Sequence, residues 1–138
     1  MHIFIEAKDS CYNVSFVVHM ESMISKILPA RFFRSESGKE PVKDWLLSLS
    51  VHDRKVIGDD IRAVEFGWPI GMPLCRSING VRGLWEIRID LSQGRIARVF
   101  FCAHKGSMVL LHGFIKKSQK TPEKEIALAT KRMKGIEK

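Results

Sequence analysis

The chain is poor in cysteine, has a single tyrosine and contains no long apolar run. Its three cysteines, Cys11, Cys75 and Cys102, show neither a C-x-x-C spacing nor paired histidines, which argues against a disulfide framework and a zinc site. No stretch approaches the roughly 18 apolar residues of a membrane-spanning helix. Glu6 and Asp9 near the start do not fit a signal peptide. We therefore expect free thiols in a cytoplasmic protein that has no membrane partner.

The motifs of several enzyme classes are also missing. The ten glycines form no phosphate-binding loop, so the sequence gives no support for nucleoside-triphosphate chemistry. Ser118 has neither a nearby histidine nor a nucleophile elbow, and no cluster of carboxylates suggests a metal site. We expect no cofactor and no metal, so any chemistry must come from ordinary side chains.

What the sequence does have is positive charge, and the charge is concentrated. The formal net charge is +8 with a pI of about 9.7. Residues 1–70 carry nine Lys/Arg and ten Asp/Glu, whereas residues 71–138 carry fourteen and five. Such a distribution favours an anionic partner over a uniformly solvated basic surface.

Apolar periodicity predicts one α+β domain over residues 23–138, preceded by an N-terminal extension over residues 1–22 whose order the sequence leaves open. A first strand at 26–33 contains Pro29, which favours an edge position. Pro41 opens a helix, and a second helix at 52–66 completes a helical hairpin. The strands expected after it are 74–78, 84–91, 95–103 and 108–115, and a last helix covers 123–133 with Thr121 as its cap. We expect the helices to pack on one face of an antiparallel sheet of about four strands.

Polar residues interrupt the apolar strands at a few positions. Glu86 and Arg88 alternate with apolar residues on one strand, and Arg98 lies within an apolar run on the next. A buried arginine keeps its charge, so it needs an anionic partner or ligand. One interpretation is a cationic floor of Arg88 and Arg98, extended by Lys116, Lys117 and Lys120 after the last strand. The alternative is a cross-strand salt bridge of Glu86 with Arg88 or Arg98. A lone strand histidine such as His112 is more often a core residue than a catalyst.

Several motifs together resemble the RelE/ParE toxin superfamily, in its phage-derived HigB-like branch. They span roughly residues 26–134 and include Arg31–Arg34, Glu40-Pro41-Val42, Trp45-Leu46, Gly67–Pro73, Leu84–Arg88, Arg98–Phe101 and Leu110–Pro122. The resemblance implies a RelE-like fold with an N-terminal helical hairpin on the sheet and a C-terminal helix. It also implies a toxin of a type II toxin–antitoxin module, a ribosome-dependent endoribonuclease that cleaves mRNA and inhibits translation. The implied partners are mRNA on the ribosome and a helix-turn-helix, HigA-like antitoxin.

By position, the resemblance nominates catalytic residues on the middle strands and after the last strand: Glu86, Arg88, Arg98, Lys117 and Lys120. Further cations nearby are expected to bind RNA, namely Lys116, Arg95, Arg82 and Lys124. Cleavage by attack of the 2′-oxygen needs orientation, a base, an acid and charge stabilisation, but no metal. Glu86 is the first candidate for the base and His112 the second.

Two alternatives stay open. A ParE-like member with the same fold would poison DNA gyrase and would not cleave mRNA. A non-catalytic phage protein would bind nucleic acid or regulate its own operon. The sequence alone does not separate these activities.

Overall fold

The computed structural model describes residues 25–116 and 121–136. Five strands form one sheet in the order β1-β5-β4-β3-β2. The strands are β1 (Ala30–Phe32), β2 (Cys75–Ser77), β3 (Trp85–Asp90), β4 (Ile96–His104) and β5 (Ser107–Lys116). β1 runs parallel to β5 and the other neighbours are antiparallel, so the sheet is mixed and the expectation of a wholly antiparallel sheet was wrong. The reason is that β1 and β5 are far apart in sequence and are not joined by a hairpin. Pro29 immediately precedes β1, which lies at an edge of the sheet as predicted.

The predicted helical hairpin is present. α2 (Pro41–Ser48) begins with proline in its first turn, where the missing N–H costs no hydrogen bond. α3 (Val51–Gly67) is capped by the Ser50 side chain, which accepts a hydrogen bond from the backbone N–H of Asp53. α4 (Glu123–Ile136) follows β5, and a short 3-10 turn, η1 (Ser92–Gly94), connects β3 and β4. The α+β class and the RelE-like arrangement of these elements are therefore confirmed.

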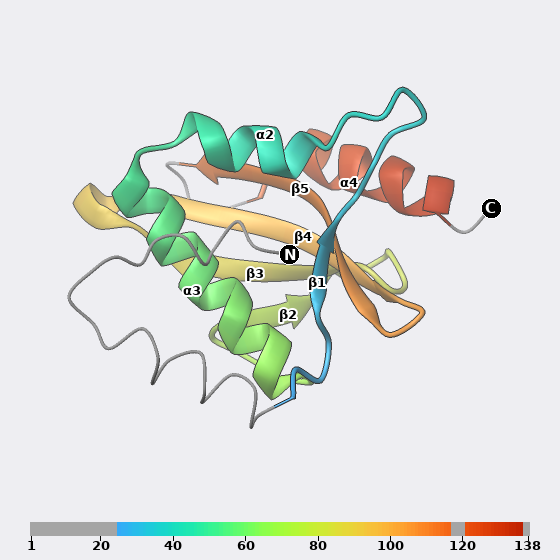
Figure 1. Cartoon of the computed structure of the whole chain (residues 1–138), viewed down its shortest axis with the longest axis horizontal. Coiled ribbons are helices and arrows are strands. Elements are labelled where there is room, and N and C mark those ends of the chain that lie inside the picture. The colour runs from blue at the N-terminus through green and yellow to red at the C-terminus, as the bar shows by residue number, and fades with distance from the viewer. Residues whose placement is uncertain (1–24, 117–120, 137–138) are drawn as a thin grey trace.

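The expectation that all helices cover one face of the sheet was wrong. α2 and α3 pack on one face, through apolar side chains that include Leu46, Ile57 and Ile61. Ala129 and Met133 of α4 belong to a second core on the opposite face, with Phe100 of β4. The molecule thus has three layers, helix pair, sheet and single helix (Figure 1). Apolar residues on both faces of β4 and β5 are the physical reason, because each face needs its own cover.

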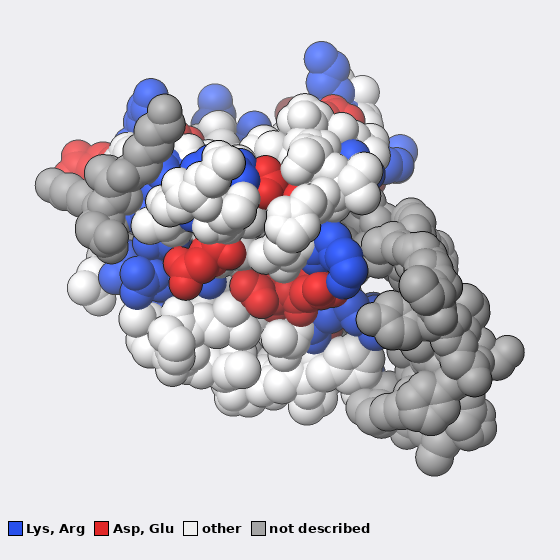
Figure 2. All heavy atoms as spheres, turned by 90° about the vertical axis from the view of Figure 1, so that its left-hand side faces the viewer, with Lys and Arg blue, Asp and Glu red and all other residues white. Residues whose placement is uncertain are grey.

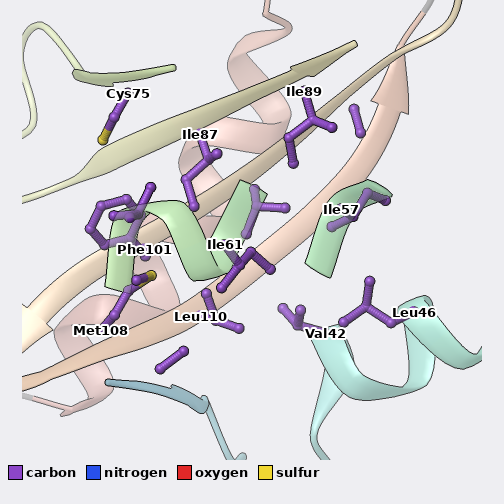
Figure 3. Packing of buried hydrophobic residues seen from close by; sticks show 14 of the residues in the cluster. Val42, Leu46, Ile57, Ile61, Cys75, Ile87, Ile89, Phe101, Met108 and Leu110 are labelled. Atoms are coloured by element: carbon purple, nitrogen blue, oxygen red, sulfur yellow. The ribbon is translucent and has the colours of Figure 1, made fainter. Parts of the chain in front are cut away.

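The larger core lies between the sheet and the helix pair, and Figure 3 shows its side chains converging from both. Ile87 and Ile89 of β3 and Phe101 of β4 point into it and are inaccessible to solvent. The residues that alternate with them therefore lie on the α4 face. This alternation places Glu86 and Arg88 on one face, as the sequence predicted, and that face is the one on which α4 packs.

A close approach between α2 and β5 requires one particular glycine. A Cβ atom added at Gly113 would lie 2.3 Å from Cζ3 of Trp45, well inside van der Waals contact. The Trp45 ring thus packs against β5 where a side chain is absent. No larger residue fits at Gly113 without moving the helix or the ring.

We predict that Gly113→Ala destabilises the protein by about 1–3 kcal/mol, the usual cost of overpacking a core. Urea unfolding followed by circular dichroism measures this change. Gly135→Ala is the matched control, because an added Cβ there meets nothing within 4 Å and alanine favours the helix. Equal stability of the two variants would contradict the packing argument.

Candidate anion-binding site on the α4 face of the sheet

Three arginines lie on three neighbouring strands of the α4 face. Arg88 of β3 is directly opposite Arg98 of β4, and Arg76 of β2 is directly opposite Glu86 of β3. Residues directly opposite each other on one face of a sheet are close neighbours. The predicted floor of Arg88 and Arg98 is therefore present on one face, and Arg76 extends it to the sheet edge.

Glu86 lies at the centre of this group with no exposed surface. Its Oε1 accepts a hydrogen bond from Nε of Arg76 at 2.7 Å. Its Oε2 lies 3.3 Å from Nε of Arg98 and accepts a hydrogen bond from the Thr121 hydroxyl at 3.0 Å. The predicted salt bridge between Glu86 and Arg98 is thus present together with the cationic floor. Both carboxylate oxygens are engaged, which makes Glu86 a buried counter-ion for cations on two flanking strands.

Arg98 is only 1% exposed, yet its hydrogen bonding is incomplete. Its Nε lies near Glu86 but makes no aligned hydrogen bond, and one terminal nitrogen makes a long 3.4 Å contact with the carbonyl oxygen of Ala97. Burial lowers the pKa of Arg98, Glu86 opposes that change, and Arg88 and Arg76 add to it. A buried guanidinium with an unaligned donor is a group that an added anion would stabilise.

A β-bulge brings the end of β5 to the same face. Phe100 pairs with His112 but Phe101 pairs with Leu110, so Leu111 is an extra residue in β5. The extra residue reverses the alternation for the rest of the strand. His112, Phe114 and Lys116 consequently face α4, not α2 and α3. Without the bulge, Lys116 would lie on the opposite face from Arg98.

Lys116 is 6% exposed, and its Nζ donates to the Thr121 hydroxyl at 3.3 Å. Burial lowers the pKa of Lys116, Arg98 lowers it further, and Glu86 partly offsets both effects. Such a lysine gives up its proton more readily than one in water. Lys116 was predicted to bind RNA, and its position beside Glu86 and Arg98 also suits proton transfer.

His112 lies on the same face but serves α4. Its Nε2 is 2.6 Å from Oε1 of Glu125, and its ring stacks on Phe114 at a centroid distance of 5.5 Å. Arg132 of α4 donates to the carbonyl oxygen of Leu111 at 2.8 Å beside it. These contacts attach α4 to β5 at the bulge. The role of His112 as a base stays a prediction, and the geometry gives it a structural task.

The other predicted site residues are dispersed. Arg95 forms a bidentate pair with Asp53 in the first turn of α3, at 2.7 and 2.9 Å, and so is held by the helix pair. Arg82 is exposed in the connection between β2 and β3, and Lys124 is exposed in the first turn of α4. Lys117 and Lys120 lie outside the described residues.

On the side of the molecule that Figure 2 shows, acidic and basic side chains are interspersed. That side, the left-hand end of Figure 1, has no large area of one charge sign among the described residues.

Two residues of the cluster were missed by sequence reasoning. Arg76 precedes a polar loop and carries no pattern of its own, so only the register of β2 against β3 reveals it. Thr121 was expected to cap the last helix, but its hydroxyl bonds Glu86 and Lys116. Its position directly before Pro122 favoured the cap, and no local signal indicates the long-range contact.

The cluster can bind an anion. Four cations, Arg76, Arg88, Arg98 and Lys116, surround the single carboxylate of Glu86, and Asp90 of β3 also acts on Arg98. Arg76, with 46% of its side chain exposed, and the half-buried Arg88 can contact a ligand directly. Arg98, only 1% exposed, lies beside them and strengthens the positive potential, and Lys116 at the end of β5 keeps a small exposed part. Within the described residues, no group of three or more His, Cys, Asp and Glu side chains could hold a metal ion.

The fold and this face define a class, the small RelE-like α+β proteins in which a helical pair covers one side of the sheet. Within that class, the chain belongs to the phage-derived protein Gp49-like family (DUF891), a RelE/HigB-like toxin family whose model matches residues 44–134. The matched segment contains every member of the cluster. No curated protein matches the chain.

In the described part of the chain, no helix is both long and apolar enough to cross a membrane.

We predict that Glu86→Gln destabilises the protein by about 3 kcal/mol or more, because it leaves buried cations without their counter-ion. Urea unfolding at neutral pH measures the loss. Asp59→Asn makes the same chemical change at an exposed pair with Lys55, and we expect an effect within about 0.5 kcal/mol. A fully stable Glu86→Gln variant would show that Glu86 is not the counter-ion of this cluster.

Because Asp53 pairs with Arg95, we predict that the stability of the protein depends on pH in the acidic range. The hydrogen bonds from Arg95 hold the pKa of Asp53 below its usual 3.8, although burial acts in the opposite direction. The unfolded carboxylate therefore takes up a proton at a higher pH than the folded one, so stability falls as the pH drops below about 3.8.

Asp53→Asn should lower the urea midpoint at pH 7 and flatten its decline between pH 5 and pH 2. Urea titrations across that range check both changes. An unchanged slope in acid would show that the pair does not link proton binding to folding.

Proposed function

We propose that the protein is a toxin of a type II toxin–antitoxin module that cleaves mRNA on the ribosome without a metal ion, in the HigB-like manner. The observation that carries the proposal is the cluster of Arg76, Arg88, Arg98 and Lys116 around a buried carboxylate on one sheet face. Membership in a phage-derived Gp49-like family supports the toxin class. The proposed partner in the cell is a helix-turn-helix antitoxin.

In this mechanism Arg76 and Arg88 hold the scissile phosphate with their planar donor groups. The 2′-hydroxyl loses its proton to water while its oxygen forms a bond to phosphorus, and the bond from phosphorus to the 5′-oxygen breaks. Lys116 gives a proton to the departing 5′-oxygen and regains one from solvent. The products are a 2′,3′-cyclic phosphate and a 5′-hydroxyl end.

The geometry changes the expected role of Glu86. A base must be open to the 2′-hydroxyl, but both oxygens of Glu86 already bind protein donors. We therefore assign Glu86 the task of holding Arg76 and Arg98 in place. Arg98, beneath the surface, stabilises the charge that develops on the phosphate.

Arg88→Gln is the sharpest test of this proposal. Among the described residues, the Arg88 guanidinium has no ion-pair partner, so its loss should spare the fold. We expect induction of the wild-type protein in bacteria to stop growth and to produce new mRNA 5′ ends. Arg88→Gln should reduce cleavage about 100-fold or more, the usual effect of removing one charge-stabilising donor.

Lys43→Gln is the matched control, because Lys43 is an exposed cation on α2, on the other side of the sheet, and should leave cleavage unchanged. DNA breaks without mRNA cuts would favour the gyrase-poison alternative. RNA binding without toxicity or cuts would favour the non-catalytic regulator. Full activity of Arg88→Gln would place the site elsewhere.

A further inference from the structure

Thr121 connects two charged members of the cluster through one hydroxyl. Its Oγ1 lies 3.3 Å from Nζ of Lys116 and 3.0 Å from Oε2 of Glu86. Thr121 is only 8% exposed, so water does not readily replace either contact. A buried threonine that touches both an ammonium and a carboxylate can fix the positions of both groups.

The direction of these hydrogen bonds is fixed by the chemistry of the groups. The Lys116 ammonium has donors only and the ionised Glu86 has acceptors only. The hydroxyl must therefore accept from Lys116 and donate to Glu86. Each bond polarises the other, because a hydroxyl that donates to a carboxylate becomes a better acceptor.

The charges around Lys116 make this acceptor important. Arg98 of β4, Arg88 of β3 and Arg76 of β2 all repel the ammonium, and Glu86 attracts it. Burial adds a further cost to the charged form. Loss of the hydroxyl would remove a hydrogen bond to the charged form and leave the repulsion unchanged.

We propose that Thr121 is a positioning residue that holds Lys116 against Glu86 and keeps Lys116 charged within the arginine cluster. Its consequence for RNA cleavage rests on the proposed function, in which Lys116 protonates the leaving oxygen. Its effect on Lys116 itself does not depend on that function. A measurement of Lys116 alone can therefore separate the two ideas.

The primary test is NMR titration of the lysine side chains in protein labelled with ¹³C and ¹⁵N, with Lys116 assigned by its loss in Lys116→Arg. We expect the Lys116 midpoint to fall by about one pH unit in Thr121→Val, and to stay near the wild-type value in Thr121→Ser. Thr130→Val is the matched control, because it removes a hydroxyl that bonds only the backbone of α4. It should not move Lys116. Unfolding in urea establishes that each variant is folded.

An unchanged Lys116 midpoint in folded Thr121→Val would overturn the inference, as would equal shifts in the valine and serine variants. If Thr121→Val fails to fold, Thr121→Ala replaces it in the same comparison.

The second readout is the pH profile of RNA cleavage. Its alkaline limb should move down with the Lys116 midpoint in the valine variant and return in the serine variant. A midpoint that shifts while the profile stays fixed would overturn the link to cleavage. Absence of cleavage by the wild-type protein would reject the proposed function and leave the NMR comparison to decide the role of Thr121.

Discussion

The buried carboxylate of Glu86 is the constraint on which the rest of the site depends. Arginines from β2 and β4 and the threonine before α4 all direct a polar atom at it. A guanidinium as buried as that of Arg98 would be very costly without an anion nearby. The negative charge of Glu86, with a smaller contribution from Asp90, thus allows several positive charges to share a sheet face and still leaves an excess that can attract a phosphate.

Much of this arrangement follows from strand periodicity. Alternation along β3 puts Glu86 and Arg88 on one face, and the short connection at η1 makes Arg98 a cross-strand neighbour. Arg76 needs the register of β2, which a three-residue strand does not reveal in sequence. Arg95 was predicted to bind RNA from its charge, but its partner Asp53 lies 42 positions away. Local patterns predict a residue's face, whereas long-range pairing decides which groups meet.

The bulge at Leu111 illustrates the limit most clearly. Strict alternation from Leu110 would send Lys116 toward the helix pair, yet one extra residue turns it toward Arg98. The same irregularity turns His112 toward α4, where Glu125 binds its ring. A single unpaired residue in β5 therefore decides both the attachment of α4 and the composition of the charged cluster. The apolar run of β5 gives no sign of it, because either register buries leucine and valine.

The placement of α4 connects the core to the chemistry. Ala129 and Met133 cover the apolar part of the face, around Phe100, while the segment just before the helix delivers Thr121 to the polar part. Thr121 thus ties the polar cluster to the start of α4. A change that loosens the start of α4 should therefore disturb the contacts of Thr121 with Glu86 and Lys116, even without touching either charged side chain.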